Sequence, residues 1–321
     1  MIRSLLRTRR SFSTLPEQVW RYSGKHAEGK AKEMVVMGGV HGNELLGVEV
    51  VRFLRAKLEA NPQAAESMKG NLTLGIGNPP AVAIGKRATE ASADLNRCFA
   101  AAKLIDDMPR YEEKRSRELA PLLSSADILL DIHATNKPGP CFVRIAGSLE
   151  EGHHRVLQHL REASHKLLDP DYILGGGVAT TDEYVGQNGG VGICYETGQA
   201  SDLSRLESIK AEVLNVLKDE IELTFPDTSY LTGTDADAMA RQTFILRESI
   251  LLEGLGTFEW APGMGRTNFE FVPANVPFGY HKGVPVSRPY DLSLVFPKVE
   301  ELFVPGKPIV WLAESRAGKC V

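Results

Sequence analysis

Short apolar runs alternate with amphipathic segments between residues 34 and 223 of the chain. The runs are too short for helices and predict buried strands. They lie at residues 34–37, 71–76, 128–132, 142–145 and 191–196. Apolar residues recur at helical spacing over residues 45–58, with Asn43 as the expected cap, and again over residues 111–123 and 203–223. This alternation predicts an α/β domain.

The pattern changes after Pro226, where short β-type runs are separated by Gly and Pro. These runs lie at residues 243–246, 256–260, 269–272, 292–296 and 309–312. They predict a smaller, mostly antiparallel β domain. We therefore expect one α/β domain over residues 17–225 and a C-terminal β domain over residues 226–321.

Composition narrows the function classes. The 321 residues carry 37 Lys and Arg against 41 Asp and Glu, a net charge of -4 that provides no general basic field for nucleic acid or an anionic membrane. No apolar run approaches the roughly 20 residues that span a bilayer. The four cysteines are scattered, which favours a reducing compartment over a disulfide framework. A small molecule is the expected partner, and a homo-oligomer is left open.

The first sixteen residues differ from the rest. Residues 1–16 contain Arg3, Arg7, Arg9 and Arg10, and no acidic residue precedes Glu17. This composition is typical of a mitochondrial transit peptide, with a mature chain beginning near Ser13. The alternative is an ordinary basic N-terminus on a cytoplasmic protein.

Two candidate metal-binding segments each follow a predicted strand. His41 and Glu44 lie three residues apart just before a predicted helix, so a first helical turn would direct both toward one point. His133 ends the run at residues 128–132 and could supply the third ligand that a catalytic zinc site needs. Asp131 could orient a ligand, although the alternation of side chains along a strand argues against this. Alone, each segment could be structural.

Two further segments offer substrate-binding and catalytic groups. Asn96 and Arg97 lie in the stretch Asp94-Leu95-Asn96-Arg97-Cys98-Phe99, where a guanidinium beside an amide can clamp a carboxylate. The alternative is that Asp94 caps a helix and Arg97 forms a surface ion pair. Glu196, in Tyr195-Glu196-Thr197-Gly198 at the end of a predicted strand, suits a general base or a simple salt bridge.

Together, the segments GGVHGNE, DLNRCF, DIH and YETG, in this order, resemble the aspartoacylase and succinylglutamate desuccinylase family of zinc carboxypeptidase-like hydrolases. The resemblance covers residues 34–200 and continues more loosely to FVPGKPIVWLAE near the C-terminus. It implies a mixed sheet flanked by helices, with the C-terminal β domain over the cleft. It also implies a zinc-dependent hydrolysis of the amide bond of an N-acyl amino acid.

The resemblance also implies roles for individual residues. His41, Glu44 and His133 match the ligands of one Zn²⁺ ion, and Glu196 matches the glutamate that activates water and protonates the leaving amine. Asn96 and Arg97 match the pair that binds the α-carboxylate of the substrate. Arg87 is the nearest candidate for the arginine that polarises the scissile carbonyl, although its spacing from DLNR is longer than in the family.

One departure bears on the substrate. Asp182 and Glu183 follow Thr180-Thr181, where relatives acting on acidic substrates have a basic residue. We therefore expect these acids to repel a side-chain carboxylate, and the substrate's side chain not to be strongly anionic. The alternatives are a zinc carboxypeptidase acting on a short peptide and a non-catalytic relative that binds a metabolite.

Overall fold

The structure of the protein is a computed structural model, which describes residues 14–24, 31–91, 93–105, 109–230 and 241–316. Most of the predicted transit peptide lies outside these residues. Among the described helices, none combines the length and apolarity needed to cross a bilayer.

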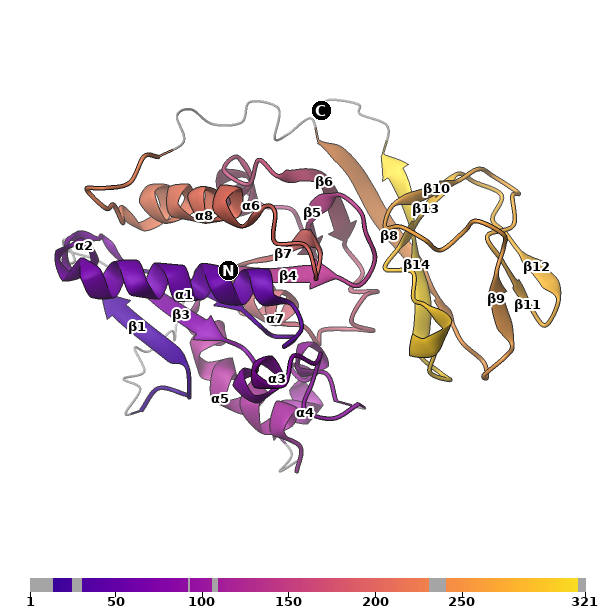
Figure 1. The fold of residues 1–321 in the computed structure, drawn as a ribbon, viewed down its shortest axis with the longest axis horizontal. Helices are drawn as coiled ribbons and strands as arrows, with labels where there is room; N and C mark the ends of the chain where they lie inside the picture. Colours follow the sequence, from indigo (N-terminus) through magenta and orange to yellow (C-terminus); the bar gives the residue numbers. More distant parts are fainter. Residues whose placement is uncertain (1–13, 25–30, 92, 106–108, 231–240, 317–321) are drawn as a thin grey trace, which may run out of the picture.

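A large mixed sheet forms the centre of the molecule (Figure 1). Its strand order is β1-β3-β2-β4-β7-β5-β6-β8-β14-β13-β10. The strands of the α/β part are β1 (Val19–Ser23), β2 (Lys32–Gly38), β3 (Gly70–Ile76), β4 (Ile128–Thr135), β5 (Cys141–Ala146), β6 (Ala163–Asp169) and β7 (Val191–Gln199). Strands β3, β2, β4 and β7 run parallel to one another, whereas β5 is antiparallel to β7.

Helices cover both faces of this sheet. The helices are α1 (Leu45–Ala60), α2 (Pro62–Ser67), α3 (Pro79–Ala83), α4 (Ala101–Ile105), α5 (Tyr111–Ser125), α6 (Glu151–Leu157), α7 (Thr181–Gln187) and α8 (Leu206–Ile221). Buried side chains of α1, α6 and α8 share one core with the sheet, and those of α5 and α7 share another on the opposite face. The predicted α/β class, a mixed sheet flanked by helices, is confirmed.

The C-terminal region is rich in β-structure and continues the same sheet. Its strands are β8 (Gln242–Leu251), β9 (Phe258–Trp260), β10 (Glu270–Val272), β11 (Gly279–His281), β12 (Val284–Val286), β13 (Leu292–Val295) and β14 (Pro308–Arg316). Strand β8 pairs in parallel with β6 and antiparallel with β14. Strands β12, β11 and β9 form a separate small sheet. The predicted boundary at residues 225 and 226 remains a prediction.

Several local expectations differ from the structure. Asn43 does not cap α1, because Glu44 occupies the cap position and makes no side-chain cap hydrogen bond. Strand β4 runs on to Thr135, so His133 lies within the strand rather than after it. Glu196 likewise lies inside β7. The pattern did not reveal β6, in which polar residues interrupt the apolar ones.

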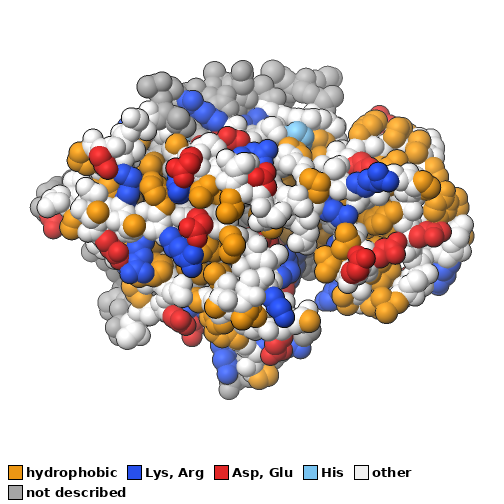
Figure 2. Space-filling view, viewed as in Figure 1, with side chains coloured by type: hydrophobic (Ala, Val, Ile, Leu, Met, Phe, Trp, Pro, Cys, Tyr) orange, Lys and Arg blue, Asp and Glu red, His pale blue; other side chains and the backbone are white. Residues whose placement is uncertain are grey.

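The carboxyl ends of β4 and β7 face the C-terminal strands (Figure 1). A furrow separates the C-terminal lobe from the rest of the molecule, with Lys and Arg side chains along its sides (Figure 2). Ligands of α/β proteins bind at such carboxyl ends. The fold therefore places the sequence-derived candidate residues at the side of the sheet that meets the C-terminal lobe.

Candidate functional site

His41 and Glu44 lie in the turn that joins β2 to α1. The Glu44 amide donates to the His41 carbonyl at 3.2 Å, and α1 begins only at Leu45. Both residues are therefore in a turn before the helix, not in its first turn as expected. Close packing holds this turn down, because a Cβ on Gly38 would lie 2.3 Å from the carbonyl carbon of Gly47. Side chains at either glycine would push α1 away from the sheet.

Three buried side chains converge at this turn. Glu44 Oε1 lies 2.7 Å from His41 Nδ1, and its Oε2 lies 3.0 Å from His133 Nδ1. One potential ligand atom from each residue lies within 4.8 Å of the others. The structure thus brings together all three residues that the sequence nominated as metal ligands.

The outer nitrogens of both imidazoles also face carboxylates. His41 Nε2 lies 3.1 Å from Asp94 Oδ1, and His133 Nε2 lies 2.9 Å from Asp131 Oδ2. Carboxylates in these positions orient metal-binding histidines and leave the inner nitrogens free for the ion. Two Nδ1 atoms and one carboxylate aimed at one point form a donor set that fits zinc.

The expected conflict between Asp131 and His133 does not arise. Side chains alternate along a strand, and residues two apart therefore share a face. Asp131 and His133 are two apart in β4, so strand geometry favours their contact. The objection raised from the sequence was wrong on this point.

Positive charges in the cluster lower the pKa of its two carboxylates, Glu44 and Asp94. Burial alone would raise the pKa of Glu44, but the charges of His41 and His133 and their hydrogen bonds hold it below its usual range. Burial would also raise the pKa of Asp94, and the Arg87 and His41 charges hold it well below the ordinary value. Both carboxylates therefore stay ionised, as a cation site requires.

Glu196 stands beside this cluster on the neighbouring strand. It is directly opposite His133 in the pairing of β4 with β7, and a register shift follows between His133 and Thr135. The carboxylate is buried, and its Oε2 has no hydrogen-bond partner among the described residues. Burial raises the pKa of Glu196 to about 7, against the opposing charge of His133. A carboxylate of this kind can accept and return a proton near neutral pH.

The candidate carboxylate-binding pair lies in a short 3₁₀ helix at Leu95–Arg97, which Asp94 caps through the Asn96 amide at 3.0 Å. Asn96 is buried, and its Oδ1 accepts a hydrogen bond from the Thr181 amide at 3.0 Å. The Thr181 hydroxyl donates in turn to Asp131. A polar chain thus connects Asn96 to the carboxylate that contacts His133.

Arg87 and Lys298 add positive charge to the same region. Arg87 pairs with Asp94 at 3.0 Å, and its Nη1 lies 3.6 Å from Glu44 Oε1. Lys298 comes from the C-terminal region. Burial, followed by the charges of Arg87 and Arg97, lowers the Lys298 pKa to about 8. The C-terminal region therefore contributes a cation to the site.

Asp182 and Glu183, the acidic pair after Thr181, are buried and paired with an arginine. The Asp182 carboxylate lies 2.8 Å from Arg144 Nη1, and Glu183 forms an ion pair with Nη2 of the same arginine. All three side chains are buried, and Asp169 also pairs with Arg144 at 2.8 Å. One guanidinium does not neutralise three carboxylates, so the expected repulsion of a substrate carboxylate by Asp182 and Glu183 stays a prediction.

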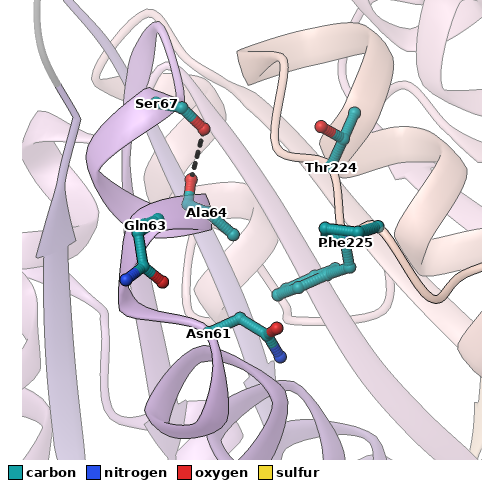
Figure 3. Close-up of a pocket in the computed structure, with 7 residues that line it drawn as sticks. Asn61, Gln63, Ala64, Ser67, Thr224 and Phe225 are labelled. Atoms are coloured by element: carbon teal, nitrogen blue, oxygen red, sulfur yellow. Dashed lines mark hydrogen bonds between the residues drawn. The ribbon is translucent and has the colours of Figure 1, made fainter.

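A separate surface cavity, of about 330 Å³, lies between α2 and the segment after α8 (Figure 3). Its lining has no ionisable side chain and consists of Asn61, Gln63, Ala64, Ser67, Thr224, Phe225 and Pro226. In Figure 3 the Ser67 hydroxyl is hydrogen-bonded to the Ala64 carbonyl. Without a titratable or metal-binding group, this cavity offers no means of hydrolysis.

Comparison with known proteins agrees with this geometry. Residues 30–218 match the model of the succinylglutamate desuccinylase/aspartoacylase catalytic domain. The chain belongs to this family. The match spans both histidines, Glu44, Asn96, Arg97 and Glu196.

Individual relatives match over part of their length. A probable aspartoacylase of a Nostoc species is 32% identical over 33% of this chain and 36% of that protein. The N-acyl-aromatic-L-amino acid amidohydrolase of Mus musculus is 29% identical over 58% of this chain and 61% of that protein. Less than two thirds of either relative is matched. A succinylglutamate desuccinylase structure from Vibrio parahaemolyticus shares the fold, with a TM-score of 0.71, 15% identity and coverage of 93% and 86% of the two chains.

Three residues of the site were not identified from the sequence as parts of it. Asp94 was read as a helix cap, and it also contacts His41 and Arg87. Thr181 had only its place in a Thr-Thr pair as a signal, and Lys298 had none. Each role depends on a contact between distant segments, which residue spacing does not encode.

Proposed function

We propose that this protein is a zinc-dependent amide hydrolase that releases a carboxylic acid and a free amino acid from an N-acyl amino acid. The observation that carries the proposal is the convergence of His41, Glu44 and His133 next to the buried carboxylate of Glu196, whose Oε2 has no hydrogen-bond partner among the described residues. Relatives named as aspartoacylases and as N-acyl-aromatic-L-amino acid amidohydrolases support the same reaction class.

His41, Glu44 and His133 would hold one zinc ion. When bound, the ion supplies Lewis acidity and lowers the pKa of water, which makes a nucleophile available at neutral pH. Asp94 and Asp131 keep the imidazoles oriented by contacting their outer nitrogens.

Glu196 would move the proton. With a pKa of about 7, its carboxylate can accept a proton from the attacking water and then deliver it to the departing nitrogen. Burial keeps competing solvent away from this transfer. Arg87, which contacts Glu44 and Asp94, would stabilise negative charge that develops on the scissile carbonyl oxygen.

Asn96 and Arg97 would bind the α-carboxylate of the substrate. Burial and nearby positive charges lower the pKa of Arg97, which means that its cation gains from an anionic partner. The contact of Asn96 with Thr181 fixes the segment that carries both side chains.

The test combines a metal assay with turnover. Purified protein should contain one zinc per chain by elemental analysis and should hydrolyse members of a panel of N-acyl amino acids. A His41→Ala, His133→Ala double variant should lose both properties. Stoichiometric zinc in that variant would refute the ligand assignment. Turnover of short peptides but of no N-acyl amino acid would indicate a carboxypeptidase, and metal binding without any turnover a non-catalytic relative.

A further inference from the structure

Strand pairing places an aromatic side chain next to Glu196 on the side away from His133. Glu196 is opposite His133 in β4 and opposite Phe142 in β5. Paired residues of neighbouring strands direct their side chains to the same face. His133, Glu196 and Phe142 therefore form a row across the sheet, in which an apolar group follows the proposed proton acceptor.

Two rings from the C-terminal region pack on Phe142. The centroid of Phe269 lies 4.9 Å from that of Phe142 in an edge-on arrangement, and the centroid of Phe296 lies at 5.6 Å. Phe142 is fully buried, whereas Phe269 and Phe296 are only partly buried. We call these three residues the aromatic cluster. Ile173 and Leu174, also partly buried, pack against the same core.

The backbone at both C-terminal rings is strained. Phe269 has a φ of 59° and Phe296 a φ of 52°, a region that bulky residues rarely adopt. Asn268 holds both in place, because it accepts a hydrogen bond from the Phe296 amide at 2.7 Å and donates to the Lys137 and Pro138 carbonyls. Such strain tends to persist at functional sites, where surrounding contacts enforce it.

The segment that carries Phe296 also reaches the polar end of the site. Lys298, two residues further on, lies close enough to Arg87 and Arg97 for their charges to affect it. Residues 296–298 therefore extend from the aromatic cluster to the proposed carboxylate-binding groups. Because Phe142 is opposite Glu196 in β5, a substrate whose carbonyl lies near Glu196 has the aromatic cluster on the side away from His133.

We propose that the aromatic cluster is a specificity subsite that receives an apolar group of the substrate. The inference rests on the proposed amide hydrolysis and adds to it the chemistry of one substituent, aliphatic or aromatic. This group belongs either to the amino-acid side chain or to the acyl chain. The expectation of a side chain that is not strongly anionic came from Asp182 and Glu183, which are buried and paired with Arg144, and the aromatic cluster gives a separate reason for it.

The test measures kcat/KM for four substrates in the full-length zinc enzyme. N-acetylphenylalanine and N-acetylalanine compare side chains, and N-benzoylglycine and N-acetylglycine compare acyl groups. We expect Phe269→Ala and Phe296→Ala to reduce kcat/KM for the larger member of one pair by about tenfold or more, with the smaller member changed by at most about threefold. Loss confined to the first pair assigns the subsite to the side chain, and loss confined to the second assigns it to the acyl group.

Controls separate specificity from stability. The ratio of two kcat/KM values from one sample does not depend on the fraction of folded enzyme, so a partly unfolded variant still gives an answer. Phe269→Leu keeps apolar volume and should retain most of the selectivity. Phe271→Ala removes a ring that is 59% exposed on the adjacent β10 and should leave both ratios unchanged.

Two results would overturn the inference. One is an equal loss for all four substrates in Phe269→Ala and Phe296→Ala, which indicates a structural role only. The other is an unchanged ratio in both pairs. Either result leaves the proposed hydrolysis intact because the wild type is active. A wild type that hydrolyses none of the four, nor any other N-acyl amino acid, removes the proposed function and this inference with it.

Discussion

Asp131 Oδ2 lies 2.9 Å from Nε2 of His133, two residues further along the same strand, while Nδ1 of this imidazole faces Glu44. The aspartate thus lies against the ring that the metal ion would use, in an ion-pair contact without hydrogen-bond geometry. We expect Asp131→Asn to weaken zinc affinity by about 10- to 100-fold, because an amide orients the imidazole less strongly. Competition with a chelator measures this. Asp171→Asn, on an exposed loop, serves as control, and an unchanged zinc affinity in Asp131→Asn would contradict the assigned role.

Replacing Glu196 by Gln should preserve the fold and the zinc content and reduce kcat by about 100-fold or more. The amide has nearly the same shape and cannot accept a proton from water. Steady-state kinetics and elemental analysis together check this. Glu207→Gln, at a side chain that is 84% exposed, is the matched control. A zinc-loaded Glu196→Gln variant with almost full activity would mean that another group activates the water.

Arg97→Lys should reduce kcat/KM by roughly 10- to 100-fold, because a point charge does not reproduce two charge-assisted hydrogen bonds. Conversion of the substrate carboxylate to an amide removes the same contact. This change should therefore cost the wild type heavily and Arg97→Ala little. Additive losses in the double comparison would show that Arg97 and the carboxylate do not interact.

The lowered pKa of Lys298 predicts that substrate binding depends on pH. Its lowered pKa, about 8, means that the side chain is mostly protonated at pH 7 and neutral above about pH 8. The attraction for an anionic substrate is thus present below this pKa and is lost as the pH rises through it. KM should increase severalfold between pH 7 and pH 9 in the wild type, and Lys298→Met should remove this increase. Lys282→Met, whose exposed ammonium pairs with Glu253, should behave as wild type. The same increase in Lys298→Met would point to another group.

The arginine-rich, acid-free N-terminus predicts mitochondrial import, with processing near Ser13. Residues 1–24 fused to a fluorescent reporter should direct it to mitochondria. A fusion with Arg3, Arg7, Arg9 and Arg10 replaced by Gln is the control. A diffuse signal from the unaltered fusion would favour the cytoplasmic alternative.

The parts of the site that could be predicted are those encoded locally. His41 and Glu44 share one turn, and His133 follows a strongly apolar run, so their spacing and surroundings suggested a common location. Asp94 and Lys298 could not be placed in the same way, since the first acts on a turn 53 residues away and the second comes from the other side of the furrow. The fold could likewise be predicted only where the local pattern was clear. Short apolar runs predicted β2, β3 and β4, whereas β6, with Ser164, His165 and Lys166 in its first half, did not stand out.

The pairing of β6 with β8 joins the C-terminal region to the catalytic sheet by backbone hydrogen bonds. A hinged opening of that region would break this ladder and uncover the Phe142 face. Substrate entry and product release should therefore take place along the furrow, without a large movement of the C-terminal lobe. For the same reason, a chain shortened to end at residue 225 would leave β6 as an unprotected edge beside exposed apolar surface, an arrangement that promotes self-association. The strands that carry the proposed subsite would thus also protect the edge of the sheet, so the enzyme's solubility and its choice of substrate would both depend on the C-terminal region.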